Sequence, residues 1–334
     1  MTAVADPLRR LSPVVRLAPA KLNLTLAVVG RREDGFHTLH SVFVPLTLAD
    51  RLSLAPAGGM RDTLHVSGLD AGPPADNLVL RAVATTRAAV GWNWAGGPGP
   101  APALAARLEK RIPVAAGLAG GSSDAAASID GALEAWDAEL DDHLRLAVAA
   151  SLGSDVPFFM AGGPALVEGR GDEVAPLHGL RGSPGVLLVT PAIAVPTPDV
   201  FAAFDAIRSH GDGAVRMSSA HLAEELRSGL TAANLVARAG VLASANDLLR
   251  ATSLVVPALV PFKRALSRLL QRPIGLSGSG PTLWALYDSE GAAAEAAEVV
   301  RSALAAGELS APGASQAFVS ASAIVSHQQQ GSEP

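Results

Sequence analysis

The most informative stretch of the sequence is Pro113-Val-Ala-Ala-Gly-Leu-Ala-Gly-Gly-Ser-Ser-Asp-Ala-Ala-Ala127. Glycines let backbone N–H groups approach an anion without interference from a Cβ atom. The alanines that follow favour a helix, whose first turn adds unpaired N–H donors and the positive end of a macrodipole. The stretch therefore predicts a phosphate-binding loop followed by a helix from about Ser123 to Trp136. A tight turn, capped by Ser or Asp before an ordinary helix, is the simpler alternative.

Two common phosphate-binding motifs do not fit this chain. A P-loop requires a Lys directly after its last glycine, and no Lys follows the glycines here. A second glycine-rich turn, Gly278-Ser-Gly-Pro-Thr-Leu283, has the first two glycines of the dinucleotide-binding fingerprint but Leu at the third position. The sequence therefore indicates a nucleotide loop of another design.

The length and the mixture of segments predict two domains of the α+β class. The chain has 334 residues, about the size of two average domains. Alternating strand-like and helix-like segments with polar turns favour α+β layers. We expect one domain over residues 1–180, a second over 181–326, and a disordered Gln-rich tail over 327–334.

The composition excludes several classes of function. A net charge of −5 and an aromatic content of 4% argue against nucleic acid as a partner. No apolar run is long enough to span a membrane, and there is no cysteine for a disulfide or a thiolate metal site. We therefore expect a cytoplasmic protein whose partners are small molecules. We also expect a monomer or a homodimer, although the composition does not decide between them.

Several shorter segments carry local signals. Asp76-Asn77 predicts the start of a helix that runs to about Val90, and Thr197-Pro198 predicts another, with Thr as its cap. Residues 103–114 fit either a helix or a strand, and residues 208–238 read as mostly helical.

Lys21 and Asn23 fall on one face of a predicted strand. Leu22, Leu24 and Leu26 alternate with them and point the other way. Only three of the 26 basic residues are lysines (Lys21, Lys110 and Lys263), which hints that each ammonium group matters where it stands. A solvated strand face would explain the pair equally well.

Asp155 is the carboxylate that stands out, because Val-Pro-Phe-Phe follows it in an apolar segment. A buried carboxylate is costly unless it is paired. If Lys21 lies nearby, both charges are explained, and the pair could orient a substrate hydroxyl. The alternative is a turn cap, a common role for Asp after Gly-Ser.

Six motifs, taken together and in this order, resemble those of the GHMP kinase superfamily. They are Pro19-Ala-Lys-Leu-Asn-Leu24, Asp34-Gly-Phe-His-Thr38, the loop from Pro113 to Asp124, Leu152-Gly-Ser-Asp-Val-Pro157, Val195-Pro-Thr-Pro198 and Leu276-Ser-Gly-Ser-Gly280. The first two are more specific, and resemble the 4-diphosphocytidyl-2-C-methyl-D-erythritol kinase family within it. The resemblance implies a ribosomal-protein-S5-like N-terminal domain, a ferredoxin-like C-terminal domain and an active site in the cleft between them. It also implies transfer of the ATP γ-phosphoryl group to the 2-hydroxyl of the cytidyl-linked methylerythritol.

The same resemblance implies roles for individual residues. Asp155 matches the catalytic base, and Lys21 the lysine that polarises the hydroxyl. The residues matched to ATP are Asn77, Pro113, Ala116, Gly117, Leu118, Ala119, Gly120, Gly121, Ser122 and Ser123. The residues matched to the substrate are Asn23, Phe36, His37, Thr197, Phe201, Gly278, Ser279 and Gly280. Mg²⁺ is implied as a second cofactor, with Ser123 as its candidate ligand and Ser122, or phosphates and water alone, as the alternatives.

Within the substrate set, His37 matches a residue that reads the cytosine edge. Phe36 and Phe201 match two aromatic residues that sandwich the base. Core packing for Phe36, a solvated turn for His37 and a plain hairpin turn for Gly278–Gly280 are the simpler explanations. His37-x-x-His40 has no third ligand in view, so we do not expect a metal there.

Two positions depart from the pattern of the family. Ala119 stands where many members have Gly, so the loop must adopt a backbone that Ala tolerates, and Phe36 replaces the usual Tyr. Two other functions remain open: another GHMP kinase, acting on homoserine, mevalonate or a sugar, and a nucleotide-binding regulator without catalysis. The paired aromatic residues argue against the former, and the presence of both Asp155 and Lys21 against the latter.

Overall fold

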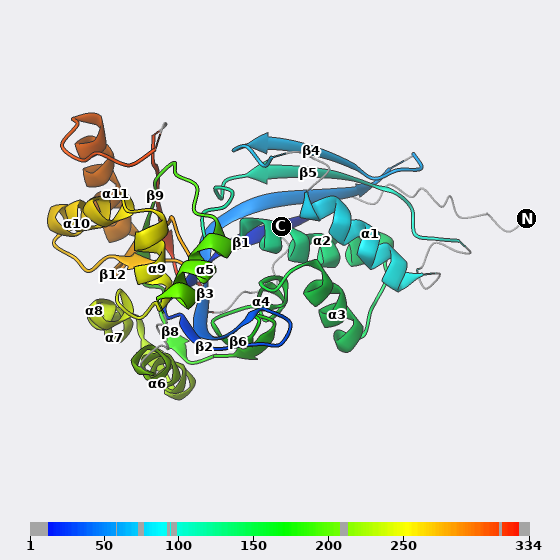
Figure 1. Ribbon diagram of the computed structural model, residues 1–334. Coiled ribbons are helices and arrows are strands. Elements are labelled where there is room, and N and C mark those ends of the chain that lie inside the picture. The colour runs from blue at the N-terminus through cyan, green and yellow to red at the C-terminus, as the bar shows by residue number, and fades with distance from the viewer. Residues whose placement is uncertain are drawn as a thin grey trace, which may run out of the picture.

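The structure is a computed structural model, which describes residues 13–57, 59–72, 77–91, 94, 99–207, 213–313 and 316–326. Two mainly antiparallel sheets lie side by side, each covered by helices (Figure 1). The α+β class is therefore confirmed. Among the described residues, no helix is both long and apolar enough to cross a bilayer.

The larger sheet is built around one long strand, β3 (His37–Pro56). It pairs antiparallel with four others: β1 (Val14–Asn23), β2 (Ala27–Arg31), β5 (Leu104–Lys110) and β6 (Ala165–Gly169). The sheet is completed by β4 (Thr63–Gly68), parallel to β5, and β7 (Glu173–Pro176), antiparallel to β6. Residues 103–114, which the sequence left ambiguous, thus contain a strand, because Leu104, Ala106 and Leu108 alternate into the core.

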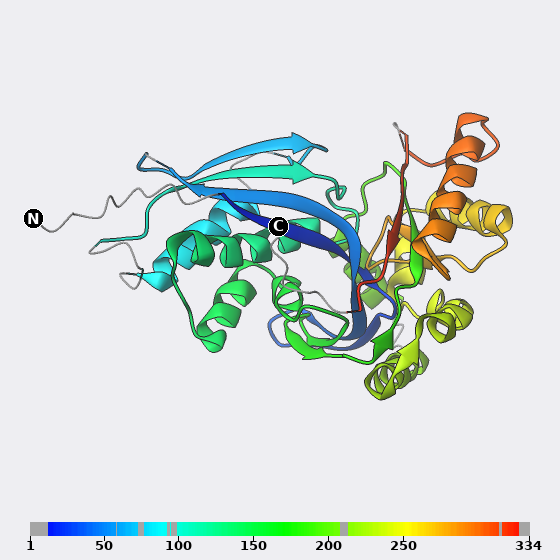
Figure 2. The same cartoon turned by 180° about the vertical axis from the view of Figure 1, so that it is seen from behind.

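Helices cover one face of this sheet (Figures 1 and 2). They are α1 (Leu78–Val90), α2 (Gly120–Trp136), α3 (Asp142–Leu152) and the short α4 (Val156–Met160). Small alanines on α2, such as Ala125 and Ala132, are fully buried and let the helix lie close to β1 and β3. As a result, the glycine-rich loop lies at the end of a packed helix.

The smaller sheet is antiparallel, in the order β11-β12-β9-β13. Its strands are β9 (Gly185–Thr190), β11 (Gly275–Leu276), β12 (Leu283–Tyr287) and β13 (Phe318–Ala323). One face packs on α10 (Leu259–Leu270) and α11 (Glu290–Ala305). Along β9, Leu187 and Val189 face these helices, whereas Val186 and Leu188 face the larger sheet.

A shared apolar core joins the two sheets. Leu22 and Val44 from the larger sheet pack in the same cluster as Leu188 and Trp284 from the smaller one. The elements not yet named are five helices and one pair of short parallel strands. They are α5 (Thr197–Ala206), α6 (Ala214–Ser228), α7 (Ala232–Ala237), α8 (Ala239–Leu242), α9 (Leu248–Val255), β8 (Leu180–Arg181) and β10 (Leu230–Thr231). Residues 213–238 are thus mainly helical, as expected.

Several element boundaries differ from the sequence prediction. Asn77 caps α1 through its side chain, as predicted, whereas Asp76 and the tail 327–334 lie outside the described residues. Helix α2 begins at Gly120, three residues earlier than expected. Thr197 was wrongly predicted as the cap of α5, since Pro196 holds that position and Thr197 is already helical. The boundary between domains near residue 180 stays a prediction.

Candidate active site

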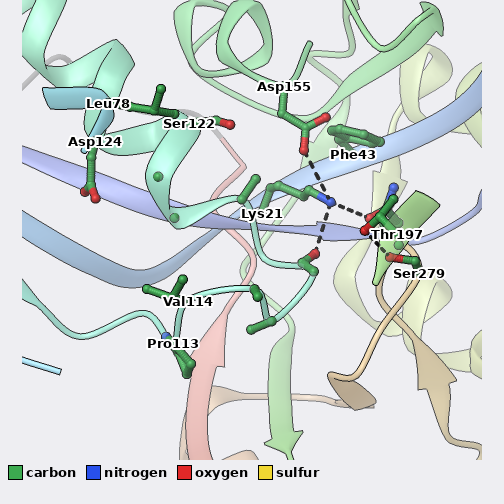
Figure 3. A pocket seen from close by; sticks show the side chains of 18 of the residues that line it. Lys21, Phe43, Leu78, Pro113, Val114, Ser122, Asp124, Asp155, Thr197 and Ser279 are labelled. Carbon is green, nitrogen blue, oxygen red and sulfur yellow. Dashed lines mark hydrogen bonds and ion pairs between the residues drawn. The ribbon is translucent and has the colours of Figure 1, made fainter. Parts of the chain in front are cut away.

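A cavity of about 460 Å³ lies where the glycine-rich loop, β1, the turn before α4 and the second glycine turn meet (Figure 3). It brings together fifteen of the predicted site residues. These are Lys21, Asn23, Asn77, Pro113, Ala116, Gly117, Ala119, Gly120, Gly121, Ser122, Asp155, Thr197, Phe201, Gly278 and Ser279.

The glycine-rich loop follows the cavity wall and ends at the first turn of α2. Gly117 has φ +77°, and a Cβ atom there would lie 2.5 Å from the Ser277 carbonyl oxygen, so only glycine fits. Leu118 is fully buried and does not line the cavity. Ala119 adopts φ 54° and ψ 33°, a left-handed conformation that costs an alanine about 1–2 kcal/mol.

Lys21 is buried at the centre of the site. Its Nζ donates hydrogen bonds to Asn23 Oδ1 (2.7 Å) and to the Gly117 carbonyl oxygen (3.1 Å), and lies 4.8 Å from the centre of the Phe43 ring. The strand register shifts between Pro19 and Lys21, and the Lys21 backbone N–H donates to Leu118 O instead of to β3. Proline has no N–H to donate, and the pairing of β1 with β3 is irregular at this point, where the Lys21 backbone contacts the glycine-rich loop instead.

Asp155 faces Lys21 from the turn that precedes α4, with Oδ2 3.8 Å from Nζ (Figure 3). Its side chain is about a third exposed and makes no capping hydrogen bond to the helix, so the turn-cap explanation is not supported. Burial lowers the pKa of Lys21, and the Asp155 carboxylate offsets part of this effect. The pair is therefore a partly solvated carboxylate beside a desolvated ammonium group.

A second lysine lies beneath the loop. Lys110 Nζ donates to Asp124 Oδ2 (2.8 Å) and to Asp50 Oδ2. Asp50 is fully buried, and its other oxygen accepts the backbone N–H groups of Arg111 and Ile112. Burial by itself would lower the pKa of Lys110, but the carboxylates of Asp124 and Asp50 outweigh it and raise that pKa. These three residues join β3, β5 and α2 next to the glycine-rich loop.

The second glycine turn, which packs against the glycine-rich loop at Gly117, and α5 complete the cavity wall. Thr197 Oγ1 lies 2.9 Å from Ser279 Oγ, and Asn246 Nδ2 donates to the carbonyls of Leu276 and Gly278. Gly280 belongs to the same turn but does not line the cavity. This turn is fixed by side chains on both flanks and is more than a plain hairpin.

The aromatic residues are only partly gathered at the cavity. Phe201 lines it, and the His37 ring stacks on Phe201 with centroids 4.7 Å apart and planes at 22°. His37 Nε2 lies 2.8 Å from Asp205 Oδ1, so His37 is not a simple solvated turn residue. Phe36 is 53% exposed, outside the cavity lining, with the Arg170 guanidinium 5.5 Å from its ring centre. Phe36 is therefore not part of a hydrophobic core.

Ser123, the predicted metal ligand, is not positioned for that role. It is 1% exposed, its hydroxyl has no hydrogen-bond partner in the described part of the chain, and it does not line the cavity. Ser122, one residue earlier, does line it. In the part of the chain that the structure describes, no three His, Cys, Asp or Glu side chains form a metal cluster.

Sequence reasoning missed several residues that shape the site. Among them are Phe43, beneath the Lys21 ammonium group, and Leu78, Val114 and Asp124 in the cavity wall. Lys110 also lines the cavity, and the rarity of lysine in the sequence had already marked it. Phe43 gave no signal, because it lies within a strand made largely of apolar residues.

Comparisons with known proteins agree with this geometry. Residues 77–163 match the family of GHMP kinases N terminal domains. A 4-diphosphocytidyl-2-C-methyl-D-erythritol kinase from Nocardia farcinica is 40% identical over 299 residues, covering 86% of this chain and 90% of the relative. The enzyme of the same name from Methylorubrum extorquens is 37% identical over 300 residues, covering 88% and 96%.

Solved structures give the same result. A crystal structure of 4-(cytidine 5'-diphospho)-2C-methyl-D-erythritol kinase matches with a TM-score of 0.67 and 30% identity, over 93% of this chain and 99% of that one. A homoserine kinase from Cytophaga hutchinsonii has a TM-score of 0.64 at 17% identity, over 96% of each chain, which shows a shared fold only. The chain belongs to the GHMP kinase superfamily and, within it, to the 4-diphosphocytidyl-2-C-methyl-D-erythritol kinase family.

Proposed function

We propose that this protein is an ATP-dependent kinase that phosphorylates the 2-hydroxyl of 4-diphosphocytidyl-2-C-methyl-D-erythritol, giving the 2-phosphate and ADP. This reaction belongs to the non-mevalonate route to isoprenoid precursors, and the family of the chain supports it. The observation that carries the proposal is the approach of Asp155 to Lys21, 3.8 Å apart beside the glycine-rich loop.

The chemistry follows from the two charges. Phosphoryl transfer depends on positioning and charge neutralisation more than on covalent help. Asp155 takes the proton of the substrate 2-hydroxyl while the oxygen of that hydroxyl bonds to the γ-phosphorus of ATP. The bond from the γ-phosphorus to the bridging oxygen breaks at the same time, and ADP leaves. Lys21, held by Asn23 and Gly117, neutralises charge on the transferring group.

The phosphates of ATP are assigned to the loop and the start of α2. The first N–H groups of a helix have no partner within it, and those of Gly120, Gly121 and Ser122 lie at the cavity. The nucleoside is assigned to the side of α1, where Asn77 and Leu78 line the cavity. Mg²⁺ usually needs few protein ligands because phosphates and water complete its shell. The Ser122 hydroxyl, in the cavity wall, fits that requirement, and a bound Mg²⁺ would supply further charge neutralisation.

The cytidyl group is assigned to Phe201, His37 and Phe36. Phe201 lines the cavity, and the His37 ring already stacks on its face. For cytosine to stack on that face of Phe201, the His37 ring must move aside. A division into domains at residues 1–180 and 181–326, and a monomer or homodimer, complete the proposal.

The proposal is tested by ADP release from Mg-ATP in the presence of the cytidyl substrate, mevalonate, homoserine or galactose, each alone. Turnover is expected with the cytidyl substrate only. Asp155→Asn should lower kcat by about 10²- to 10⁴-fold while ATP binding persists. Asp130→Asn is a matched control, since it removes the carboxylate of an ion pair with Arg145 outside the cavity.

Each other outcome has a defined meaning. Turnover with a different alcohol would keep the kinase and overturn the pyrimidine site. ATP binding without turnover of any of the four compounds would favour a non-catalytic regulator. Equal loss of activity in Asp155→Asn and Asp130→Asn would remove Asp155 from the chemistry.

A further inference from the structure

The Lys21 ammonium group is held by acceptors on two sides. It has three protons to donate. Two go to Asn23 Oδ1 and Gly117 O, and the remaining side faces Asp155. The orientation of the ammonium group thus depends on Asn23 presenting its carbonyl oxygen. The same amide, rotated by half a turn, would place an NH₂ group against the ammonium.

A buried serine decides which way the Asn23 amide points. Asn23 Nδ2 lies 3.2 Å from the hydroxyl of Ser41, which is fully buried on β3 and does not line the cavity. The Ser41 hydroxyl donates its single proton to the backbone carbonyl of Thr25, which can only accept. Toward Asn23, Ser41 can therefore only accept, and this fixes Nδ2 on its side and Oδ1 on the side of Lys21.

The other neighbour of Asn23 Oδ1 does not fix it in this way. Ser277 Oγ lies 3.4 Å from Asn23 Oδ1 but only 2.9 Å from Gly117 O. Its one proton serves the nearer acceptor. Of the two serines beside Asn23, Ser41 is therefore the one that fixes the orientation of the amide.

We infer that Ser41 is a positioning residue for phosphoryl transfer, which fixes the Asn23 amide and thereby holds the Lys21 ammonium group between the phosphate loop and Asp155. The inference rests on the proposed kinase function. Ser41 touches neither substrate nor nucleotide, and it acts two hydrogen bonds away from the reacting atoms.

The inference has a consequence for pH dependence. The charged group that faces Lys21 is Asp155, while β3 and the loops before α2 and β12 present the Phe43 ring, the Gly117 carbonyl and Gly278. Without a fixed Oδ1, the ammonium form loses an acceptor and the pKa of Lys21 falls further. Because the protonated lysine is the active form, the alkaline limb of the kcat profile should move to lower pH.

Ser219 offers a matched control. It is also fully buried, and its hydroxyl lies 2.9 Å from Thr25 Oγ1 and 3.0 Å from His40 Nδ1, with no contact to Asn23. Ser219→Ala therefore removes a buried hydroxyl of the same kind without freeing the amide.

The experiment measures kcat, both KM values, the pH profile of kcat and the melting temperature for the wild type, Ser41→Ala, Ser41→Thr and Ser219→Ala. Ser41→Ala should lower kcat about tenfold, because the Lys21 ammonium group loses its hydrogen bond to Asn23. The alkaline limb of the kcat profile should move down by about one pH unit. The KM for ATP should change little. Ser41→Thr, which keeps the hydroxyl, should retain the wild-type profile, and so should Ser219→Ala.

The contrary results are distinct. A wild-type kcat and pH profile in folded Ser41→Ala would overturn the inference, as would an equal loss in Ser41→Ala and Ser219→Ala with no shift of the limb. If Ser41→Ala does not fold, Ser41→Cys, which fills similar space with a weaker donor and acceptor, is judged by the same criteria. A wild type that does not turn over the cytidyl substrate would instead overturn the proposed function.

Discussion

Lys110 Nζ lies 2.8 Å from Asp124 Oδ2, and the second carboxylate oxygen of Asp124 is buried without a hydrogen-bond partner in the described ranges. Asp50 shares the same ammonium group and is otherwise fully hydrogen-bonded. Two carboxylates thus compete for one cation in a buried space. Burial raises the pKa of Asp124 to about 7, against the opposing effect of Lys110. With a pKa of about 7, Asp124 is partly protonated near neutral pH.

The raised pKa makes stability depend on pH. In the unfolded chain Asp124 ionises at about pH 4, so between about pH 4 and 7 the folded state binds more protons than the unfolded state. The stabilisation is complete below the unfolded pKa and is lost as the pH rises through the folded pKa. The side chain introduced by Asp124→Asn is neutral at every pH, so this variant should not show the loss of stability with rising pH. The free energy of unfolding of the wild type, relative to this variant, should fall by up to about 1.4 kcal/mol per pH unit in that window.

Denaturant unfolding of both proteins at several pH values between 4.5 and 8 checks this expectation, since titrating groups that do not interact with Asp124 cancel in the difference. Asp62→Asn, which removes an ion pair with Arg87 away from the cavity, is the control for loss of a carboxylate. If the difference in the free energy of unfolding between wild type and Asp124→Asn does not change with pH, Asp124 stays ionised in the folded state across this range.

Ala119 gives a second prediction, on stability alone. It is held at φ 54°, where a side chain is disfavoured and glycine is not. Ala119→Gly should raise the free energy of unfolding by about 1 kcal/mol. Ala126→Gly, within the regular part of α2, should lower it by a similar amount. Thermal denaturation of the two variants side by side measures both, and destabilisation by Ala119→Gly would mean that the loop does not need this conformation.

How far the sequence could predict the site depended on the type of signal. The loop, Lys21 and Asp155 were found because their chemistry is unusual in its surroundings, and Asn77 because helix caps have local rules. Phe43, Asp124 and the start of α2 at Gly120 could not be found, because each depends on contacts between segments far apart in the chain. Thr197 was assigned as a cap from a local pattern, whereas its hydroxyl contacts Ser279 from another element. Ser123 failed for the same reason: which serine of a pair faces the cavity is set by how α2 packs.

The pyrimidine site gives a prediction for substrate binding. Stacking of a base on an aromatic ring contributes about 1–3 kcal/mol, so Phe201→Ala should raise the KM for the cytidyl substrate about tenfold or more and leave the KM for ATP unchanged. Phe36→Ala should have the same effect, since Phe36 is the other aromatic residue assigned to the base, although it lies outside the cavity lining. Steady-state kinetics with each substrate varied in turn gives both values. An unchanged KM in Phe36→Ala would restrict the base site to Phe201 and His37.

The pKa of Lys21 gives the last prediction. Burial lowers this pKa, and Asp155 only partly offsets the effect. Since the ammonium form is the active one, kcat should fall as the pH rises through the pKa of Lys21, at a pH below the ordinary lysine value of about 10.4. Lys21→Arg stays charged throughout this range. The variant should lose about 10- to 100-fold in kcat, because the planar guanidinium does not reproduce the contacts of an ammonium group, but its remaining activity should show no alkaline limb. The pH profile of kcat under saturating substrates measures both effects. If Lys21→Arg keeps the wild-type limb, another group titrates there, and the charge on Lys21 is not what limits the reaction at high pH.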